Sequence, residues 1–211
     1  MKEIYLLSGL GADKRVFDFI DFTGFSVNHI SWIEPLGGES IESYAKRLLQ
    51  QIPTSTPIII GISFGGMISI EIAKLVRTEK VVLISSAETK TDIPLAYKIV
   101  GSLHVYKIIP VSILKSANIF SFWLFGTRTK KEKDLLRVIM RDTDTRFLKW
   151  SVDAIAHWRN EQRLDNVTRI HGTADRILPL RRADYVIKGG GHLMIVNKAQ
   201  EVTKVLRKVL S

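Results

Sequence analysis

Apolar residues along the chain follow two patterns, short continuous runs and runs that recur at helical spacing. Strands are predicted at residues 3–8, 25–32, 57–62, 81–85, 167–171 and 183–188, and most of them are continuously apolar. Helical spacing is clearest after Ser40, a predicted N-cap, and it places on one face Ile41, Tyr44, Ala45, Leu48, Leu49 and Ile52. Further helices are predicted at residues 13–22, 66–77 and 198–209. Apolar strands that alternate with helices indicate an α/β protein with a mostly parallel sheet covered on both faces.

Residues 91–165 contain no strand pattern. Helices are predicted there at residues 95–105, 111–125, 130–141 and 145–159. One crossover helix needs far fewer residues, so we expect a helical cap inserted after the fourth strand. The predicted organisation is a core of residues 1–90 and 166–211, and a cap of residues 91–165. The apolar run 119–125 indicates a pocket or lid, or alternatively the interior of the cap.

The sequence GISFGG, residues 61–66, follows the third predicted strand and precedes a predicted helix. Glycine weakens a strand, so packing does not explain this cluster. Gly61-Ile62-Ser63-Phe64-Gly65 matches G-x-S-x-G, the nucleophile elbow, in which small residues let strand and helix approach at a tight turn. The motif and its context together predict that Ser63 is a nucleophile.

A serine nucleophile needs a base, and the chain has five histidines. His192 is the best candidate, because it follows three glycines beyond the last strand. The other four are interpreted differently: His29 as structural within a strand, His104 and His157 as surface positions or pocket residues of the cap, and His171 as part of a turn.

The base in turn needs an acid that orients the imidazole. Asp175 lies in HGTADRILP, directly after the fifth strand, and is the first candidate. Asp92, after the fourth strand, is the reserve candidate, whereas Asp165 precedes a strand and belongs to the opposite end of the sheet. The backbone N–H groups of Leu10, in SGLG after the first strand, and of Phe64 are the predicted oxyanion-hole donors. A plain glycine turn is the alternative for SGLG.

The motifs SGLGAD, GISFGG, HGTADRILP and GGGH resemble those of the α/β-hydrolase superfamily in order and spacing. The resemblance covers essentially the whole chain. It implies a Ser–His–Asp triad of Ser63, His192 and Asp175, an acyl-enzyme, and the spatial strand order 2-1-3-4-5-6. Two departures stand out. Ser8-Gly9 replaces the His-Gly pair of many relatives. The first predicted strand starts at residue 3, so we expect a compact, six-stranded version without the two leading strands of larger relatives.

Composition adds a few constraints. The 211 residues carry 31 Lys and Arg against 21 Asp and Glu, a net charge of +10. This net charge has three interpretations: a solvated basic surface, attraction to an anionic substrate, or attraction to an acidic surface. Nucleic-acid binding is not expected, because no binding motif accompanies the charge. The chain has no cysteine, which excludes disulfides, and it has no metal-ligand cluster or dinucleotide motif, so we expect neither metal nor cofactor.

Membrane insertion is not expected either. The longest apolar tract, residues 99–125, is interrupted by Lys107, Pro110 and Lys115. Residues 4–7 are interpreted as a first strand rather than a signal-peptide core, and we expect a cytoplasmic protein. Peripheral attachment through the cap, assisted by the basic surface, is an alternative hypothesis. No oligomeric state is predicted.

These features predict a serine hydrolase that cleaves an ester, thioester or similarly activated acyl bond. The expected partner is a small-molecule acyl substrate, either apolar or anionic. Two alternatives are a lyase or acyltransferase that uses the same triad, and a non-catalytic ligand-binding module on the same scaffold.

Overall fold

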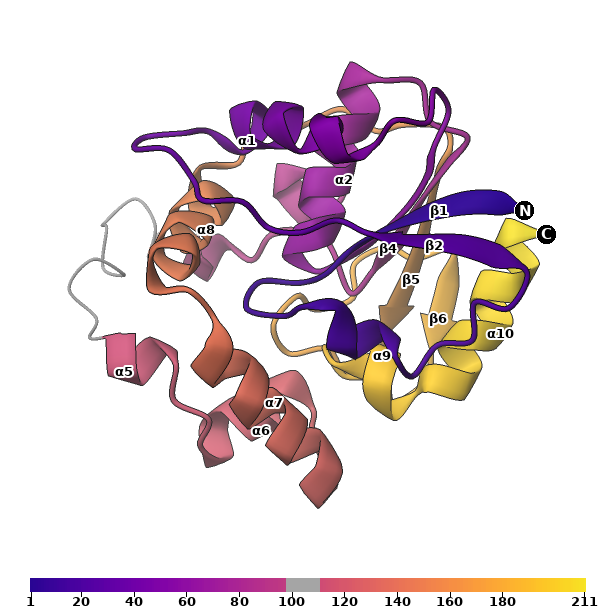
Figure 1. Cartoon of the computed structure of the whole chain (residues 1–211). Helices are drawn as coiled ribbons and strands as arrows, with labels where there is room; N and C mark the ends of the chain where they lie inside the picture. The colour runs from indigo at the N-terminus through magenta and orange to yellow at the C-terminus, as the bar shows by residue number, and fades with distance from the viewer. Residues whose placement is uncertain (98–110) are drawn as a thin grey trace.

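A parallel sheet of six strands forms the centre of the computed structural model, which describes residues 1–97 and 111–211 (Figure 1). Its spatial order is β2-β1-β3-β4-β5-β6, as the resemblance to the α/β-hydrolase superfamily implies. The strands are β1 Lys2–Leu7, β2 Phe25–His29, β3 Ile58–Ile62, β4 Lys80–Ile84, β5 Val167–Gly172 and β6 Tyr185–Ile187. β3 is buried along its whole length, which a sheet covered on both faces requires.

Helices cover both faces of the sheet. α1 (Ile41–Leu48) and α2 (Phe64–Leu75) pack against the face that carries Tyr5, Ile59 and Leu83. α9 (Met194–Asn197), α10 (Ala199–Leu210) and the 3₁₀ turn η1 (Lys14–Phe17) pack against the alternate strand residues, such as Ile60 and Val82. Successive side chains of a strand point to opposite faces, so the two apolar cores are separate layers. Figure 1 shows α1 and α2 on one side of the sheet and α9 and α10 on the other.

Four complete α-helices lie between β4 and β5 in the described part of the chain, besides the helical residues 95–97. They are α5 Val111–Leu114, α6 Ile119–Phe125, α7 Lys130–Asp142 and α8 Thr145–His157. Figure 1 shows α6 and α7 extending away from the sheet. The boundaries of a separate cap at residues 91–165 stay a prediction, and most of the predicted helix 95–105 lies outside the described residues. The prediction of a single helix over residues 111–125 is wrong. The side chain of Asn118 accepts from the N–H groups of Phe120 and Ser121 and starts a new helix there.

Two shorter elements also differ from prediction. Residues 13–22 form only the turn η1, because the bonds Val16 N–H to Asp13 C=O and Ile20 N–H to Phe17 C=O each span three residues. β2 ends at His29 rather than at residue 32, because its partner β1 ends at Leu7 and the chain then enters the SGLG turn. The remaining 3₁₀ turns are η2 Leu49–Gln51 and η3 Lys90–Asp92.

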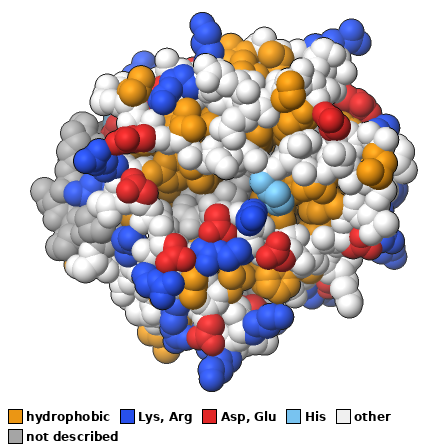
Figure 2. Space-filling view, in the orientation of Figure 1, with side chains coloured by type: hydrophobic (Ala, Val, Ile, Leu, Met, Phe, Trp, Pro, Cys, Tyr) orange, Lys and Arg blue, Asp and Glu red, His pale blue; other side chains and the backbone are white. Residues whose placement is uncertain are grey.

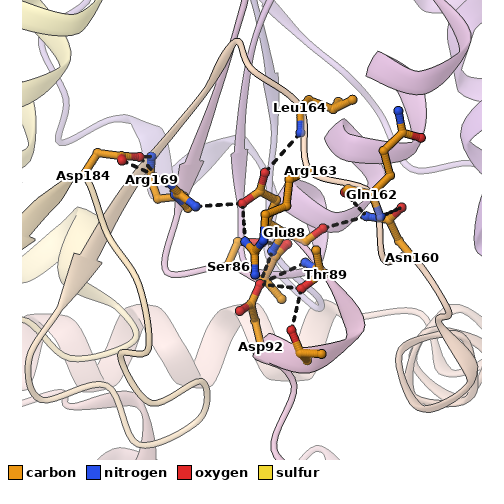
Figure 3. Close-up of polar contacts among 12 residues, drawn as sticks. Ser86, Glu88, Thr89, Asp92, Asn160, Gln162, Arg163, Leu164, Arg169 and Asp184 are labelled. Atoms are coloured by element: carbon orange, nitrogen blue, oxygen red, sulfur yellow. Dashed lines mark hydrogen bonds and ion pairs between the residues drawn. The ribbon is translucent and has the colours of Figure 1, made fainter.

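An ion-pair cluster joins the chain on either side of the four helices (Figure 3). The carboxylate of Glu88, just beyond β4, is 2% exposed. Arg163, before β5, and Arg169, within β5, each place a guanidinium nitrogen 2.8 Å from Glu88 Oε2. Arg169 also contacts Asp184 at 2.9 Å. A buried carboxylate is stable only when it is paired, so this cluster holds the ends of β4 and β5 and the segment that precedes β5 together.

No helix in the described ranges is long and apolar enough to cross a membrane.

Candidate active site

Ser63 occupies the turn between β3 and α2, and its backbone is strained. Its φ of 50° and ψ of −121° fall in a region that residues with a side chain rarely adopt. Two hydrogen bonds hold this conformation. The N–H of Ser63 donates to the Ile84 carbonyl at 3.0 Å, and the hydroxyl of Ser86 donates to the Ser63 carbonyl at 2.6 Å. The tight turn therefore presents the Ser63 side chain beyond the carboxyl end of β3.

The glycines of GISFGG allow this turn. A Cβ atom on Gly61 would lie closer than 3.0 Å to Gly66 Cα and to the Gly65 carbonyl oxygen. A Cβ on Gly65 would meet the Leu7 and Ser8 carbonyl oxygens of β1 and the following turn, again within 3.0 Å. Gly66 has no room for one beside Ser86. All three positions require glycine because strand, helix and neighbouring turn approach so closely.

The structure brings Ser63, His192 and Asp175 together. His192 Nε2 lies 2.9 Å from Ser63 Oγ, and His192 Nδ1 lies 2.9 Å from Asp175 Oδ2. The side chains of His192 and Asp175 are 6% and 0% exposed. An ionised carboxylate only accepts hydrogen bonds, so Nδ1 carries the proton and Nε2 is free to accept from the Ser63 hydroxyl.

Asp175 is surrounded by donors. Its Oδ1 accepts from the N–H groups of Ile177 and Leu178, both at 2.9 Å, while Oδ2 faces His192. Burial alone would raise the pKa of Asp175. The charge of His192, the hydrogen bonds from His171 and His192 and the Leu178 N–H outweigh burial, and the pKa lies well below its ordinary value. Asp175 is therefore a fixed negative charge next to the imidazole.

His171 is a second histidine beside Asp175, and the sequence interpretation did not include it in the site. Its Nε2 lies 2.7 Å from the Leu178 carbonyl oxygen and 3.3 Å from Asp175 Oδ2. Because a carbonyl oxygen only accepts, Nε2 carries a proton and donates. The side chain is buried, so it fixes the turn that carries the acid. The spacing of four residues between His171 and Asp175 is the only sequence signal of this contact.

The two predicted oxyanion donors both line the pocket that contains Ser63. Neither the N–H of Leu10 nor that of Phe64 donates to another group within residues 1–97 and 111–211. The SGLG turn is held by the Ser8 hydroxyl, which donates to the Ala12 carbonyl at 2.7 Å. From α7, the C-cap Thr143 donates to the Gly11 carbonyl at 3.0 Å. These contacts fix the turn beside Ser63 and leave its amides available to a ligand.

An apolar pocket of about 270 Å³ opens at Ser63 and His192. α7 lines it with Leu136, Ile139 and Met140, and α8 lines it with Val152, Ile155 and Ala156. Apart from Ser63 and His192, Tyr97 is the one side chain with a polar group among the described lining residues. Burial, followed by the charge of Asp175, raises the pKa of Tyr97, so its hydroxyl stays neutral.

The other predicted candidates lie away from Ser63 or outside the described residues. Asp92 accepts from the N–H groups of Glu88 and Thr89, so its carboxylate caps η3 and does not contact His192. His29 lies at the end of β2, where its ring is tilted against the Phe17 ring at 5.8 Å between centroids. His157 contacts Asp153 in α8, Asp165 is exposed before β5, and His104 lies outside the described residues. No group of three His, Asp or Glu side chains in the described ranges has the arrangement of a metal site.

This chain resembles known proteins in its structure and not in its sequence. No protein-family model matches the chain, and no curated protein matches its sequence. A hydrolase from Pseudomonas aeruginosa PA01 superposes with a TM-score of 0.81 at 15% identity, over 100% of this chain and 90% of that one. A bromoperoxidase from Bacillus anthracis superposes with a TM-score of 0.75 at 16% identity, over 99% of this chain and 91% of that one. An esterase from Exiguobacterium antarcticum superposes with a TM-score of 0.74 at 16% identity, over 100% of this chain and 92% of that one.

Proposed function

The chain has the α/β-hydrolase fold, and we propose that it is a serine hydrolase of esters or thioesters with an uncharged, apolar acyl group. The observation that carries this proposal is the continuous chain of 2.9 Å contacts from Asp175 through His192 to Ser63. An unactivated hydroxyl is a weak nucleophile, and this arrangement supplies both the base and the group that orients it.

In the proposed reaction, Ser63 Oγ attacks the acyl carbonyl carbon while His192 Nε2 takes the hydroxyl proton. The N–H groups of Leu10 and Phe64 donate to the oxyanion that forms. The imidazolium returns the proton to the leaving alcohol or thiol as its bond to the acyl carbon breaks. A water molecule then attacks the acyl-enzyme with His192 as base, which releases the carboxylic acid and restores Ser63. Asp175 stays ionised throughout and stabilises the imidazolium.

The pocket supports the apolar acyl class over the anionic one. Its described lining contains no Lys or Arg, although the chain carries a net charge of +10. An acyl chain loses apolar surface to water when it enters such a pocket, whereas a carboxylate would lose its hydration without gaining a partner. The basic residues are therefore placed for a role outside the acyl pocket.

Labelling with a fluorophosphonate probe, followed by peptide mapping, tests the activated serine. We expect modification at Ser63, which is lost in Ser63→Ala and in His192→Ala. Ser43→Ala, which changes an exposed serine of α1, is the matched control and retains labelling. Folded protein without labelling would contradict the proposal and favour a ligand-binding module.

The products then distinguish the reactions that share this triad. With soluble p-nitrophenyl esters as substrates, we expect one free acid for each alcohol released in water. Transfer of the acyl group to an added alcohol or thiol, at the expense of free acid, would instead indicate an acyltransferase. Labelling at Ser63 without any ester or thioester turnover would favour the lyase alternative.

A further inference from the structure

One face of α6 is apolar and exposed. Ile119, Phe120 and Trp123 are 87%, 63% and 53% exposed, and the rings of Phe120 and Trp123 stack at 6.0 Å. These three side chains share one side of the helix, and Ser121 and Phe122, on the other side, are buried. Burying such side chains stabilises a protein, so an exposed cluster of this kind marks a contact surface.

Basic residues accompany this face. Residues 111–141 contain seven Lys and Arg against two Asp and Glu, an excess of five that is half of the net charge of the chain. Lys133 and Arg137 of α7 lie over the Phe122 ring, and Arg176 lies over the Trp123 ring at 4.6 Å. Figure 2 shows Lys and Arg side chains gathered, with hydrophobic and some acidic ones between them, over the part where Figure 1 places α6 and α7.

The two acidic residues of this segment are already engaged. Glu132 accepts from the Arg128 N–H and the Thr129 hydroxyl, at the start of α7. Asp134 pairs with Arg137. Arg128 and Lys130, which follow α6, are exposed. The segment therefore combines an apolar helix face with a positive field.

α6 is also attached to the loops that carry His192 and Asp175. The Leu193 N–H donates to the Phe125 carbonyl at 3.1 Å, and the Phe125 ring lies edge-on to the His192 ring at 5.8 Å. Arg176, next to Asp175, donates to the Trp123 carbonyl at 2.8 Å. One side of α6 thus borders the pocket while its other side is exposed.

We propose that α6 docks the protein on an anionic lipid surface, with Ile119, Phe120 and Trp123 inserted among the acyl chains. Helices that lie in a membrane interface combine an apolar face with Lys and Arg, which attract anionic headgroups. A second copy of this chain fits the face less well, because it would bring its own excess of positive charge against the first. The sequence alone offers peripheral attachment through the cap only as an alternative hypothesis, because it does not indicate which residues of 119–125 are exposed.

Cosedimentation with vesicles tests the proposal without using activity. We expect the protein to pellet with vesicles of phosphatidylcholine and phosphatidylglycerol at low salt, and much less with pure phosphatidylcholine or at high salt. The double variant Ile119→Ser/Phe120→Ser should lose binding at least about tenfold. The double variant Arg128→Gln/Lys130→Gln should weaken partitioning about fivefold for each charge removed.

Matched variants elsewhere serve as controls. Leu36→Ser/Leu75→Ser changes apolar residues that are 58% and 48% exposed, and Lys46→Gln/Lys204→Gln changes exposed charges of α1 and α10. We expect the apolar pair to leave binding unchanged and the charge pair to change it less than twofold. Absence of vesicle binding in the wild type would overturn the proposal, and so would wild-type binding by both Ile119→Ser/Phe120→Ser and Arg128→Gln/Lys130→Gln.

Self-association and catalysis are measured separately from lipid binding. Sedimentation velocity detects self-association, and a dimer that Ile119→Ser/Phe120→Ser abolishes, without vesicle binding by the wild type, would assign the face to a second copy and overturn the lipid proposal. Turnover of a soluble short-chain ester tests the proposed hydrolase on its own. This turnover should stay within about twofold in Ile119→Ser/Phe120→Ser and in Arg128→Gln/Lys130→Gln, because none of the four side chains lines the pocket.

Discussion

His171 Nε2 lies 3.3 Å from Asp175 Oδ2 and 2.7 Å from the carbonyl oxygen of Leu178, within the turn that carries the acid. Asp175 therefore receives donors from two histidines and from two backbone amides. The contact with His192 orients the imidazole toward Ser63. The contact with His171 holds the turn itself, and His171 is a positioning residue in the proposed reaction.

Loss of the His171 donor should reduce turnover without abolishing it. We expect His171→Phe to lower kcat about tenfold with little change in KM, because Asp175 keeps its backbone donors but loses the support of the turn. His171→Gln keeps an N–H donor and should recover most of the rate. Asp175→Asn, which removes the charge, should cost about 10³ to 10⁴ in kcat. Steady-state kinetics of the three variants measure these changes in kcat. An equal loss of kcat in His171→Phe and His171→Gln would contradict the positioning role.

The approach of α2 to β1 at Gly65 predicts a strong effect of one methyl group. Gly65→Ala would place a Cβ closer than 3.0 Å to the carbonyl oxygens of Leu7 and Ser8. We expect destabilisation by about 2–4 kcal/mol, or a displaced Ser63 with no probe labelling. Gly37→Ala is the control, since its Cβ would meet nothing within 4 Å. Urea unfolding and probe labelling of both variants check the prediction, and similar stabilities together with labelling of Ser63 in both would refute the packing argument.

The buried Glu88 cluster predicts a difference between two glutamates. Glu88→Gln keeps the shape but removes the charge that two guanidinium groups face, and it should destabilise the fold by about 1–3 kcal/mol. Glu79→Gln breaks an exposed pair with Lys2 and should change stability by less than about 0.5 kcal/mol. Chemical denaturation at neutral pH measures both. The cluster would be unimportant for stability if the two substitutions had the same effect.

Tyr44 predicts a specific loss of stability in alkali. Burial raises its pKa from 10.0 to about 12, and its hydroxyl donates to the Ile33 carbonyl at 2.8 Å. Between these values the unfolded chain loses the phenol proton while the folded chain keeps it, so stability falls as pH rises from about 10 to 12.

Tyr44→Phe removes this titration together with the hydrogen bonds to Ile33. We expect the variant to be less stable than the wild type at pH near 8, by about 1–2 kcal/mol. The difference in stability between Tyr44→Phe and the wild type should shrink as the pH rises from about 10 to 12. Unfolding measurements at several alkaline pH values test this, and a constant difference would mean that Tyr44 does not titrate as described.

The wall that α8 contributes to the pocket predicts an effect of acyl-chain length. Ala156→Phe, on α8, fills space that an acyl chain would occupy. We expect kcat/KM for a long-chain soluble ester to fall about tenfold or more, while that for an acetate ester stays within about twofold. The ratio of the two substrates in each protein corrects for small changes in the triad. An equal fall for both esters would place the acyl chain elsewhere.

Much of the fold could be predicted because its signals are local. β3 and β4 are continuous apolar runs in the sequence, and buried parallel strands require such runs. Ser63, Asp175 and His192 each follow a strand, and the carboxyl ends of parallel strands meet at one edge of the sheet. Local patterns were therefore sufficient to name three residues that lie far apart in the chain and close together in the structure.

The features that the sequence did not predict depend on hydrogen bonds between residues far apart in the chain, or on which of several possible partners a side chain bonds. Asn118 interrupts an apolar helical pattern because its side chain caps a new helix, and spacing of apolar residues does not report this. His171 is next to Asp175 only because the following turn brings the Leu178 carbonyl to its ring. The orientation of α6 likewise depends on the bond from Leu193 to Phe125, which joins two segments that are far apart in sequence.

The pairing of Glu88 with Arg163 also bears on which changes in the length of the intervening chain the core tolerates. The chain leaves the core just after Glu88 and returns at Arg163, and the two side chains meet at 2.8 Å. For the ends of β4 and β5, the segment between these two residues is a loop whose ends are held together by the ion pair. The entropy of closing such a loop grows only with the logarithm of its length, about 0.6 kcal/mol for each doubling. Loop-closure entropy therefore limits the length of this segment only weakly, and what limits it is packing. Phe147 of α8 and its C-cap residue Trp158 belong to the apolar core and have to stay, whereas the exposed end of α6 could be lengthened at little cost to the sheet.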